Sequence, residues 1–194
     1  MMKLRHLTAA DYKRMPWKNG QGSTTELIAS PGAEGGAFNW RLSIAEVGQS
    51  GPFSDFSGYD RFITLIEGAG MILNFNGMME RRIDQPFQPL PFDGGWQTDC
   101  TLIDGPLRDF NLMVARNWGY TAMTILRPDA GEDCEIDVAP VTLLHVFTGN
   151  VSLEIDGARH HLKSGDTLHI EDAPDAWLRA DQASILAAIY LQPR

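Results

Sequence analysis

Apolar and polar residues alternate along most of this chain with a period of two. Because successive side chains of a strand point to opposite faces, this alternation predicts β-strands that each have one buried face. Glycine, proline, asparagine or aspartate ends nearly every alternating segment, which is typical of short strands joined by turns. The predicted strands span residues 40–47, 61–68, 70–77, 109–116, 142–149, 151–157 and 183–191.

Local signals add two hairpins and one helix to these strands. The dipeptides Asn-Gly at 76–77 and Asp-Gly at 156–157 favour the positive φ angles of two-residue hairpin turns. Residues 8–15 predict a short helix, because Thr8 is a suitable N-cap, Asp11 follows three residues later, and a proline comes directly after the segment.

A pattern of strand, glycine, strand and hairpin occurs twice. Residues 65–83 match residues 146–162 in this pattern, with an offset of one residue. A unit that is repeated once among short antiparallel strands predicts an all-β fold of two jelly-roll barrels in one chain. The expected domains are residues 1–116, which include the short N-terminal helix, and residues 117–194. A single long β-sandwich is the alternative interpretation.

Composition narrows the classes of partner. The formal net charge of −9 opposes contact with phosphate backbones and anionic lipids, so we expect neither nucleic-acid nor membrane binding. The first 15 residues lack the apolar segment of a signal peptide, and no later segment is long enough to span a bilayer. Cys100 and Cys134 are the only cysteines, which is typical of a reducing compartment and of buried, unreactive thiols. We therefore expect a cytoplasmic protein.

Familiar catalytic and cofactor motifs do not occur in the sequence. A metal site in a small β-barrel usually needs two histidines two residues apart, which places both rings on one face of a strand. No such pair occurs among the five histidines, and the adjacent His160 and His161 would face opposite sides. The chain also lacks a GxSxG segment, and no GK[ST] follows Gly20 and Gly22. We therefore expect no metal and no other cofactor.

Three predicted strands carry polar side chains on one face. These residues are Arg41 and Ser43 on 40–47, Arg61 and Glu67 on 61–68, and Asp109 and Asn111 on 109–116. Each polar face is either exposed to solvent, as is usual for antiparallel strands, or lines the mouth of a barrel. In the second case the two arginines suit a carboxylate ligand, because a guanidinium binds a carboxylate through two parallel hydrogen bonds. The alternation fits both interpretations.

Five blocks in a fixed order resemble the HutD/Ves family. They cover most of the chain from Met15 to about Arg116, and they read PWKNGQGSTTEL, WRLSIAEV, GPFS, RFITLIEG and DFNLM. The resemblance implies a bicupin fold, that is, two cupin-like barrels in one chain, and a bacterial cytoplasmic protein. From Trp118 onward the chain is similar to the family mainly in pattern and length.

The resemblance also implies a function. The implied protein is encoded with the enzymes of histidine degradation. It senses a pathway intermediate, such as urocanate or formylglutamate, and does not catalyse a step. Ves-type members have no settled chemistry. Lys18 and the glycines that follow it make this chain more similar to HutD than to Ves.

The first of these blocks contains a turn-prone loop at residues 16–22. Its proline sets the entry to the turn and its glycines admit positive φ angles. We expect Trp17, Lys18 and Asn19 to lie over the barrel mouth as an apolar wall, a cation and an amide, and Gln21 to point outward. The alternative is a structural loop in which Asn19 bonds its own backbone and Trp17 caps the core.

Three functions are compatible with these features, and the leading hypothesis is a metal-free, small-carboxylate-binding protein with a regulatory role in histidine catabolism. An enzyme that acts on an imidazole or formamido compound is the second, with Glu67 or Asp109 as its general base. A protein-interaction module is the third, and the edge strands of a jelly roll also admit a homodimer. The expected ligand-binding residues are Trp17, Lys18, Asn19, Arg41, Ser43, Arg61, Glu67 and Asn111.

Overall fold

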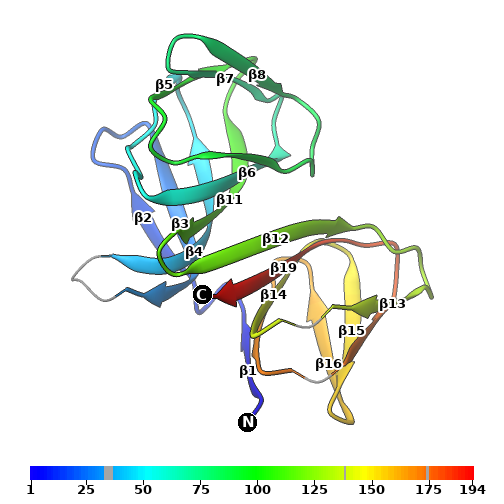
Figure 1. Ribbon diagram of the computed structural model, residues 1–194. Coiled ribbons are helices and arrows are strands. Elements are labelled where there is room, and N and C mark those ends of the chain that lie inside the picture. Colours follow the sequence, from blue (N-terminus) through cyan, green and yellow to red (C-terminus); the bar gives the residue numbers. More distant parts are fainter. Residues whose placement is uncertain (33–36, 138, 174) are drawn as a thin grey trace. The chain divides into compact units, whose positions relative to one another are not determined.

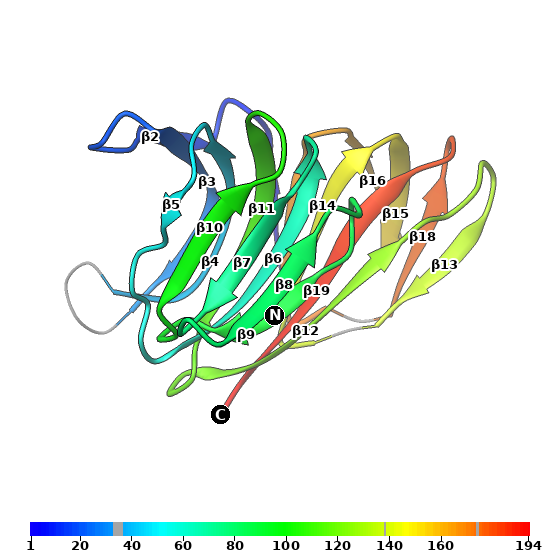
Figure 2. The same ribbon diagram turned by 90° about the horizontal axis from the view of Figure 1, so that it is seen from above.

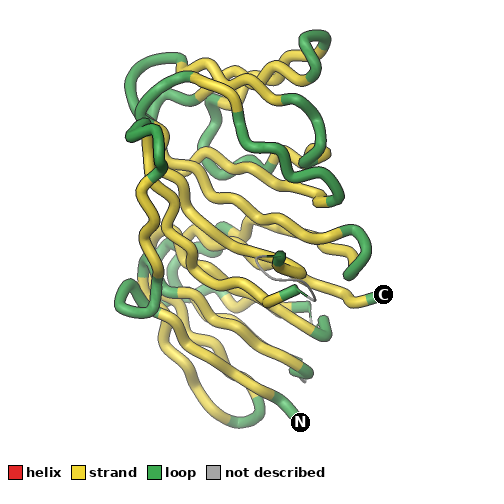
Figure 3. The backbone as a smooth tube through the Cα atoms, turned by 90° about the vertical axis from the view of Figure 1, so that its left-hand side faces the viewer, coloured by secondary structure: helices red, strands yellow, loops and turns green. Residues whose placement is uncertain are grey.

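The structure, a computed structural model, describes residues 1–32, 37–137, 139–173 and 175–194. These residues form strands, turns and loops, and none of them lies in a helix (Figure 3). The strand pairs between them are antiparallel. The predicted all-β class is therefore confirmed. It also follows that the described residues contain no helix long and apolar enough to cross a membrane.

The chain forms two compact units (Figure 1). The 12–118 unit is Tyr12–Trp118, and the 119–194 unit is Met1–Asp11 together with Gly119–Arg194. The predicted division after residue 116 placed the whole N-terminus in the first unit. In the structure Met1–Asp11 instead joins the second unit, because β1 (Lys3–Leu7) pairs with β17 (Thr167–Glu171). A pairing between segments so distant in the chain leaves no local signal in the sequence.

Two sheets make up the 12–118 unit, in the strand orders β2-β3-β4-β11-β6-β9 and β5-β10-β7-β8 (Figure 2). Its strands are β2 (Lys13–Pro16), β3 (Gly22–Pro31), β4 (Phe38–Val47), β5 (Gly51–Pro52), β6 (Tyr59–Glu67), β7 (Met71–Phe75), β8 (Met79–Ile83), β9 (Leu90–Asp93), β10 (Thr98–Leu102) and β11 (Leu107–Ala115).

The 119–194 unit also consists of two sheets, in the orders β1-β17-β14-β19-β12 and β13-β18-β15-β16. Its remaining strands are β12 (Gly119–Leu126), β13 (Asp133–Ile136), β14 (Val141–Thr148), β15 (Asn150–Ile155), β16 (Ala158–Lys163), β18 (Ala176–Ala180) and β19 (Ile185–Pro193). Each predicted strand overlaps one of the observed strands, so the period-two pattern located them correctly.

The core of each unit lies between its two sheets. In the 12–118 unit Leu65 of β6 packs in one cluster with Leu73 of β7, and both are fully buried. In the 119–194 unit Leu144 of β14 packs in the same way with Leu153 of β15. Such burial stabilises the fold by roughly 25 cal/mol per Å² of apolar surface. Hydrogen bonds join the strands of each unit into two separate sheets, so the closed barrels of the prediction are not found in the described parts of the chain.

The predicted repeat and its hairpins are confirmed. β7 and β8 are joined through Asn76 and Gly77, whose φ angles are 54° and 67°. β15 and β16 are joined through Asp156 and Gly157, whose φ angles are 49° and 72°. Two consecutive positive φ angles are the signature of the type I′ turn that suits the twist of antiparallel strands.

The predicted helix at residues 8–15 is wrong. Residues 9–11 form a turn, in which the Asp11 amide donates to the Thr8 carbonyl at 2.9 Å and the Thr8 amide donates to Asp11 Oδ2 at 2.9 Å. The second bond is a contact that the N-cap pattern predicts, whereas the first is a backbone bond that closes a single turn. The next residues pair with β3 as strand β2, because an isolated helix of about two turns is marginal compared with a strand pairing that tertiary structure supports.

Candidate functional site

A cavity of about 550 Å³ lies in the 12–118 unit, among strands β4, β6 and β11 and the loops that precede β3 and β6. Asp109, the alternative general base, also lines it. The cavity brings together most of the predicted ligand-binding residues, namely Trp17, Lys18, Asn19, Arg41, Ser43, Arg61 and Asn111.

The strand register explains why these distant residues meet. β11 lies between β4 and β6, and Met113 of β11 is paired with Arg41 on one side and with Arg61 on the other. Two residues earlier on β11, Asn111 is paired with Ser43. Because paired residues share a face of the sheet, the polar faces of all three strands point into one space. Ser43, Arg61 and Asn111 are at most 5% exposed, so these faces are not solvent-exposed.

Arg61 holds its guanidinium among aromatic rings. Its Cζ lies 4.8 Å from the centre of the Phe92 ring and 5.4 Å from the centres of Phe53 and Phe56. Nη2 donates to Asn111 Oδ1 at 3.0 Å, whereas the buried Nε has no hydrogen-bond partner among the described residues. Burial lowers the pKa of Arg61 to about 10, although the nearby carboxyl of Asp109 on β11 opposes this shift. The side chain therefore stays cationic at neutral pH.

Arg41 is a second cation on the cavity wall. Its Cζ lies 4.6 Å from the centre of the Phe38 ring and 5.4 Å from that of Phe56, so Phe56 lies near both guanidiniums. Arg41 Nη2 donates to Met113 Sδ at 3.6 Å, which is a weak acceptor, and its buried Nε lacks a partner in the described part of the chain. A buried donor without an acceptor costs free energy.

A buried polar chain connects Arg61 to a carboxyl group. Asn111 accepts from Arg61 through Oδ1 and donates through Nδ2 to Asp109 Oδ1. Asp109 is 1% exposed, and burial raises its pKa to about 7, opposed by Arg61 and by the hydrogen bond from Asn111. The carboxyl therefore takes up or releases a proton near neutral pH, which is typical of groups at functional sites.

Sequence reasoning missed the aromatic part of the cavity. Phe53 and Phe56 lie in the loop before β6 and were not among the predicted residues. The available signal was the GPFS block, because Phe53 belongs to it.

Cys100 lines the cavity as well, and burial, reinforced by Asp109, raises the pKa of its thiol to about 12. This thiol is therefore unreactive at neutral pH; Cys134 is only half-buried.

The loop before β3 supports the cavity as much as it lines it. Trp17 Nε1 donates to Thr24 Oγ1 at 2.9 Å, and Asn19 Oδ1 accepts from the Gln21 amide at 3.0 Å. Asn19 therefore shapes its own turn, as in the structural interpretation. A Cβ atom on Gly22 would lie 2.9 Å from the Trp17 ring, so only glycine fits there.

Two further residues complete the rim. Lys18 is exposed and forms no ion pair with any described residue, so its ammonium group is available to a ligand. Gln21 was expected to point outward, and that expectation is wrong. Its side chain is half-buried, lines the cavity and accepts from Asn19 Nδ2 at 3.1 Å.

Glu67 does not line this cavity, contrary to the prediction. The register between β6 and β11 shifts so that Asp109 pairs with Leu65 but Arg108 pairs with Glu67. This bulge places one extra residue on β6 and turns the Glu67 side chain to the face opposite Leu65. There it accepts from Arg108 Nη1 at 3.2 Å, and its side chain is 67% exposed.

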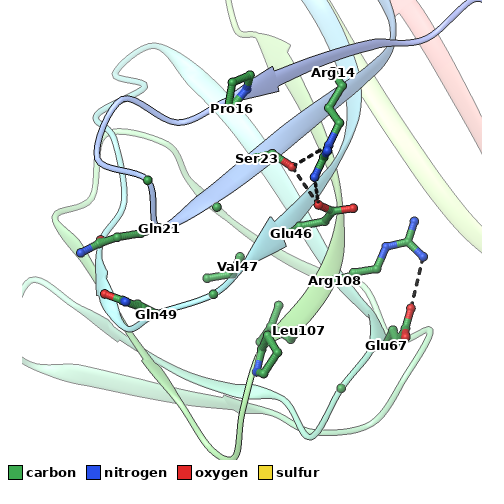
Figure 4. A pocket seen from close by; sticks show the side chains of 15 residues that line it. Arg14, Pro16, Gln21, Ser23, Glu46, Val47, Gln49, Glu67, Leu107 and Arg108 are labelled. Atoms are coloured by element: carbon green, nitrogen blue, oxygen red, sulfur yellow. Dashed lines mark hydrogen bonds and ion pairs between the residues drawn. The ribbon is translucent and has the colours of Figure 1, made fainter.

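Glu67 instead borders a second, more open hollow of about 910 Å³ in the same unit (Figure 4). Figure 4 shows its charged side chains in two pairs, Arg108 with Glu67 and Arg14 with Glu46, the latter at 2.6 Å. Ser23 also donates to Glu46 Oε2 at 2.9 Å. Because each of these charges is already paired, this hollow offers an ionic ligand less than the cavity with unpaired arginine donors.

The repeat shows which cavity residues the fold itself does not need. The β6–β11 pairing corresponds to the β14–β19 pairing in the 119–194 unit, and both have a bulge at the same position. The pair formed by Leu65 and Asp109 in the 12–118 unit therefore corresponds to the pair formed by Val146 and Leu186 in the 119–194 unit. In this correspondence Asp109 matches Leu186. Leu186 is fully buried in the apolar core of its unit. A leucine can thus occupy the register position of Asp109.

The other two members of the polar chain, Asn111 and Arg61, also correspond to residues of a different kind in the 119–194 unit. Asn111 corresponds to Ala188, and Arg61 corresponds to Thr142. Ala188 belongs to the apolar core of the 119–194 unit. Because the same strand arrangement forms without these polar groups, packing alone does not explain them. This comparison favours a function for the cavity of the 12–118 unit.

Metal-binding side chains do not gather in the described part of the chain. It contains no group of three or more histidine, cysteine, aspartate or glutamate side chains placed to hold a metal ion. The charged and amide groups that line the cavity are two guanidiniums, an ammonium, four side-chain amides and one carboxyl group with a pKa near neutrality.

The sequence profile of the HutD family matches residues 9–188 of the chain. The chain belongs to the HutD family. Among the curated relatives of this HutD-family chain, an uncharacterized 21.2 kDa protein in the hutC 3′ region of Pseudomonas putida is 47% identical over 115 residues. Protein Ves of Cronobacter sakazakii is 36% identical over 111 residues. These matches cover 59% and 55% of this chain and 60% of each relative, so the chain spans about three fifths of the length of these relatives.

Solved structures extend the similarity over the whole HutD-family chain. A conserved protein of unknown function from Pseudomonas aeruginosa PAO1 has a TM-score of 0.89 and 36% identity, covering 98% of this chain and 99% of the other. HutD from Pseudomonas fluorescens SBW25, in a formate condition, has a TM-score of 0.83 and 35% identity, covering 99% and 100%. A Cupin 2 conserved barrel domain protein from Leptotrichia buccalis, at 12% identity, a TM-score of 0.63 and coverage of 95% and 97%, supports the cupin-like fold alone.

Proposed function

We propose that this chain binds a small carboxylate in the cavity of the 12–118 unit and has a regulatory role in histidine catabolism. The observation that carries the proposal is the pair of guanidiniums of Arg41 and Arg61, each with a buried Nε donor that no described residue accepts from. A guanidinium offers a carboxylate two parallel hydrogen bonds. The volume of about 550 Å³ is within the range of small-molecule pockets, roughly 300–1,000 Å³.

Local charge favours an anion even though the whole chain is acidic. The formal net charge is −9, yet the cavity holds Lys18, Arg41 and Arg61 against the single carboxyl of Asp109. Phe53 and Phe56 add apolar walls that suit a planar or short aliphatic skeleton. A small acid whose carboxylate lies between the two arginines would therefore satisfy the cavity better than a neutral molecule of the same size.

The link to histidine catabolism comes from the relatives. The Pseudomonas putida relative lies in the hutC 3′ region, and a structural neighbour carries the name HutD. The pathway intermediates urocanate and formylglutamate are both small carboxylates, so we take them as the first ligands to test. Binding without turnover is what a sensor of such an intermediate requires.

Binding is expected to raise the melting temperature of the protein in a thermal-shift assay. A ligand that binds only the native state stabilises it, by about 2.7 kcal/mol at roughly 100 times its dissociation constant. We expect a saturable shift with urocanate or formylglutamate and none with imidazole or formamide, which lack the carboxylate. Absence of a shift with every small carboxylate tested would contradict the proposal.

An enzyme is the second candidate, and one observation favours it. Asp109 is buried beside the cavity and its pKa is raised to about 7, which suits a general base at neutral pH. In that case prolonged incubation should consume urocanate or formylglutamate, and Asp109→Asn should stop the reaction. Chromatography of the incubated mixture measures this. Unchanged intermediates together with saturable binding would reject the enzyme and leave the binding protein.

A further inference from the structure

Asp109 is a buried carboxylate with spare hydrogen-bonding capacity on the wall of the cavity. Its Oδ1 accepts from Asn111 Nδ2, and Oδ2 has no hydrogen-bond partner among the residues that the structure describes. A carboxylate has room for about four hydrogen bonds, and a buried one with a single bond is incompletely satisfied. Its neighbours in the register, Ala45 and Leu65, are apolar and offer no donor.

Asn111 fixes which end of the cavity donates and which end accepts. Its Oδ1 must face Arg61, because a guanidinium only donates, and its Nδ2 must then face Asp109. The cavity therefore has hydrogen-bond donors at its arginine end and an acceptor at its Asp109 end. A single amide group spans the distance between them, so the two ends lie within reach of one small molecule.

The other charged and titratable groups around Asp109 are consistent with donors at the arginine end of the cavity and an acceptor at the Asp109 end. Arg61 of β6 favours its ionised form, and Cys100 of β10 is the other titratable group that senses its charge. Arg41 of β4 in turn influences Arg61. No second carboxyl group lines the cavity in the described residues, so Asp109 alone can accept strongly from a ligand there.

We infer that Asp109 is a specificity residue, and that the ligand class is a small acid that carries an N–H donor within a few bonds of its carboxylate. This inference rests on the proposed function, because it assumes that Arg41 and Arg61 hold the carboxylate. The N–H group of the ligand donates to Asp109, either from an imidazole or from an amide. Acids of the same size without an N–H group leave Asp109 buried and incompletely bonded, so they bind more weakly.

Matched pairs of acids test this inference by isothermal titration calorimetry at about pH 8, where Asp109 is ionised. Urocanate and trans-cinnamate share the acrylate but only urocanate has an imidazole N–H; N-formylglutamate and glutarate differ by the formamide. We expect wild-type protein to prefer the N–H member of at least one pair about tenfold or more, the worth of one charge-assisted hydrogen bond. The pair that shows the preference distinguishes an imidazole from an amide donor.

The variant Asp109→Leu should lower that preference to within about twofold, because the acid without the N–H group then leaves no buried carboxylate without a donor. Leucine is chosen because Leu186 occupies the same register position in the 119–194 unit. If this variant does not fold, as judged by circular dichroism, Asp109→Ala replaces it with the same expectation. Equal binding of both members of each pair by the wild type, or an unchanged preference in the variant, would overturn the inference and leave carboxylate binding intact. Failure of all four acids to bind would overturn both proposals.

Discussion

Arg61→Met is expected to weaken the binding of urocanate or formylglutamate at least tenfold. Methionine keeps much of the length of the aliphatic stem but removes the guanidinium, which lies over the Phe92 ring. The lost interaction is a charge-assisted hydrogen bond to a carboxylate, worth about 1.5–3 kcal/mol, and a tenfold change corresponds to about 1.4 kcal/mol. Titration calorimetry with wild-type and variant protein measures the ratio of the dissociation constants.

Arg108→Met is the matched control for this experiment. Arg108 lies on the neighbouring strand β11, but it faces the other side of the sheet and pairs with the exposed Glu67. An exposed ion pair of this kind is worth about 0–1 kcal/mol, and it makes no contact with the cavity. We therefore expect unchanged ligand affinity in this variant. Equal affinities of wild type and a folded Arg61→Met variant would remove Arg61 from the proposed site.

The second large effect is a pH dependence of stability that comes from Asp109. Burial raises its pKa from 3.8 to about 7 in the folded protein. Below pH 3.8 the group is protonated in both states. Between these two values the unfolded chain releases the proton while the folded chain retains it, so the free energy of unfolding falls as pH rises. The slope approaches about 1.4 kcal/mol per pH unit, and it ends once the pH exceeds the folded pKa.

Urea unfolding from about pH 5 to about pH 8 measures this effect as a difference between two proteins. Asp109→Asn cannot titrate at this position, so the stability of the wild type should fall relative to this variant as pH rises. The difference removes the contribution of histidines, which titrate in the same range. Asp99→Asn, at an exposed position on β10, serves as the control and should follow the wild type. Parallel pH profiles for wild type and Asp109→Asn would show that Asp109 titrates normally.

The polar strand faces show where interpretation of the sequence had to stop. The period of two placed Arg41 with Ser43 and Asp109 with Asn111, but it could not choose between exposure to solvent, which is the default for an antiparallel strand, and the mouth of a barrel. The pairing of β11 with both β4 and β6 decided the question, because it set these faces side by side on the same side of one sheet, where they line a cavity. Strand neighbours that are distant in the chain leave no trace in local periodicity.

Glu67 and residues 8–15 show how tertiary structure overrides a local rule. Strict alternation put Glu67 on the face of Arg61, and one extra residue in a bulge moved it to the other face. The signals for a helix start at Thr8 were real as hydrogen bonds, yet strand pairing with β3 took the following residues. Bulges and long-range pairings depend on the partner strand, which the segment itself does not encode.

The sequence by itself determined that the chain is all-β, where its strands and two hairpin turns lie, that a strand unit recurs, and which polar residues stand apart from the apolar pattern. Those features follow from side-chain alternation and from the φ angles that glycine and asparagine or aspartate accept, and both are local properties. Only the tertiary structure decided that Met1–Asp11 joins the 119–194 unit, that Glu67 leaves the cavity, and that Arg61, Asn111 and Asp109 form one buried chain. These outcomes depend on register between distant strands, which is set by the packing of the whole unit and not by any one segment.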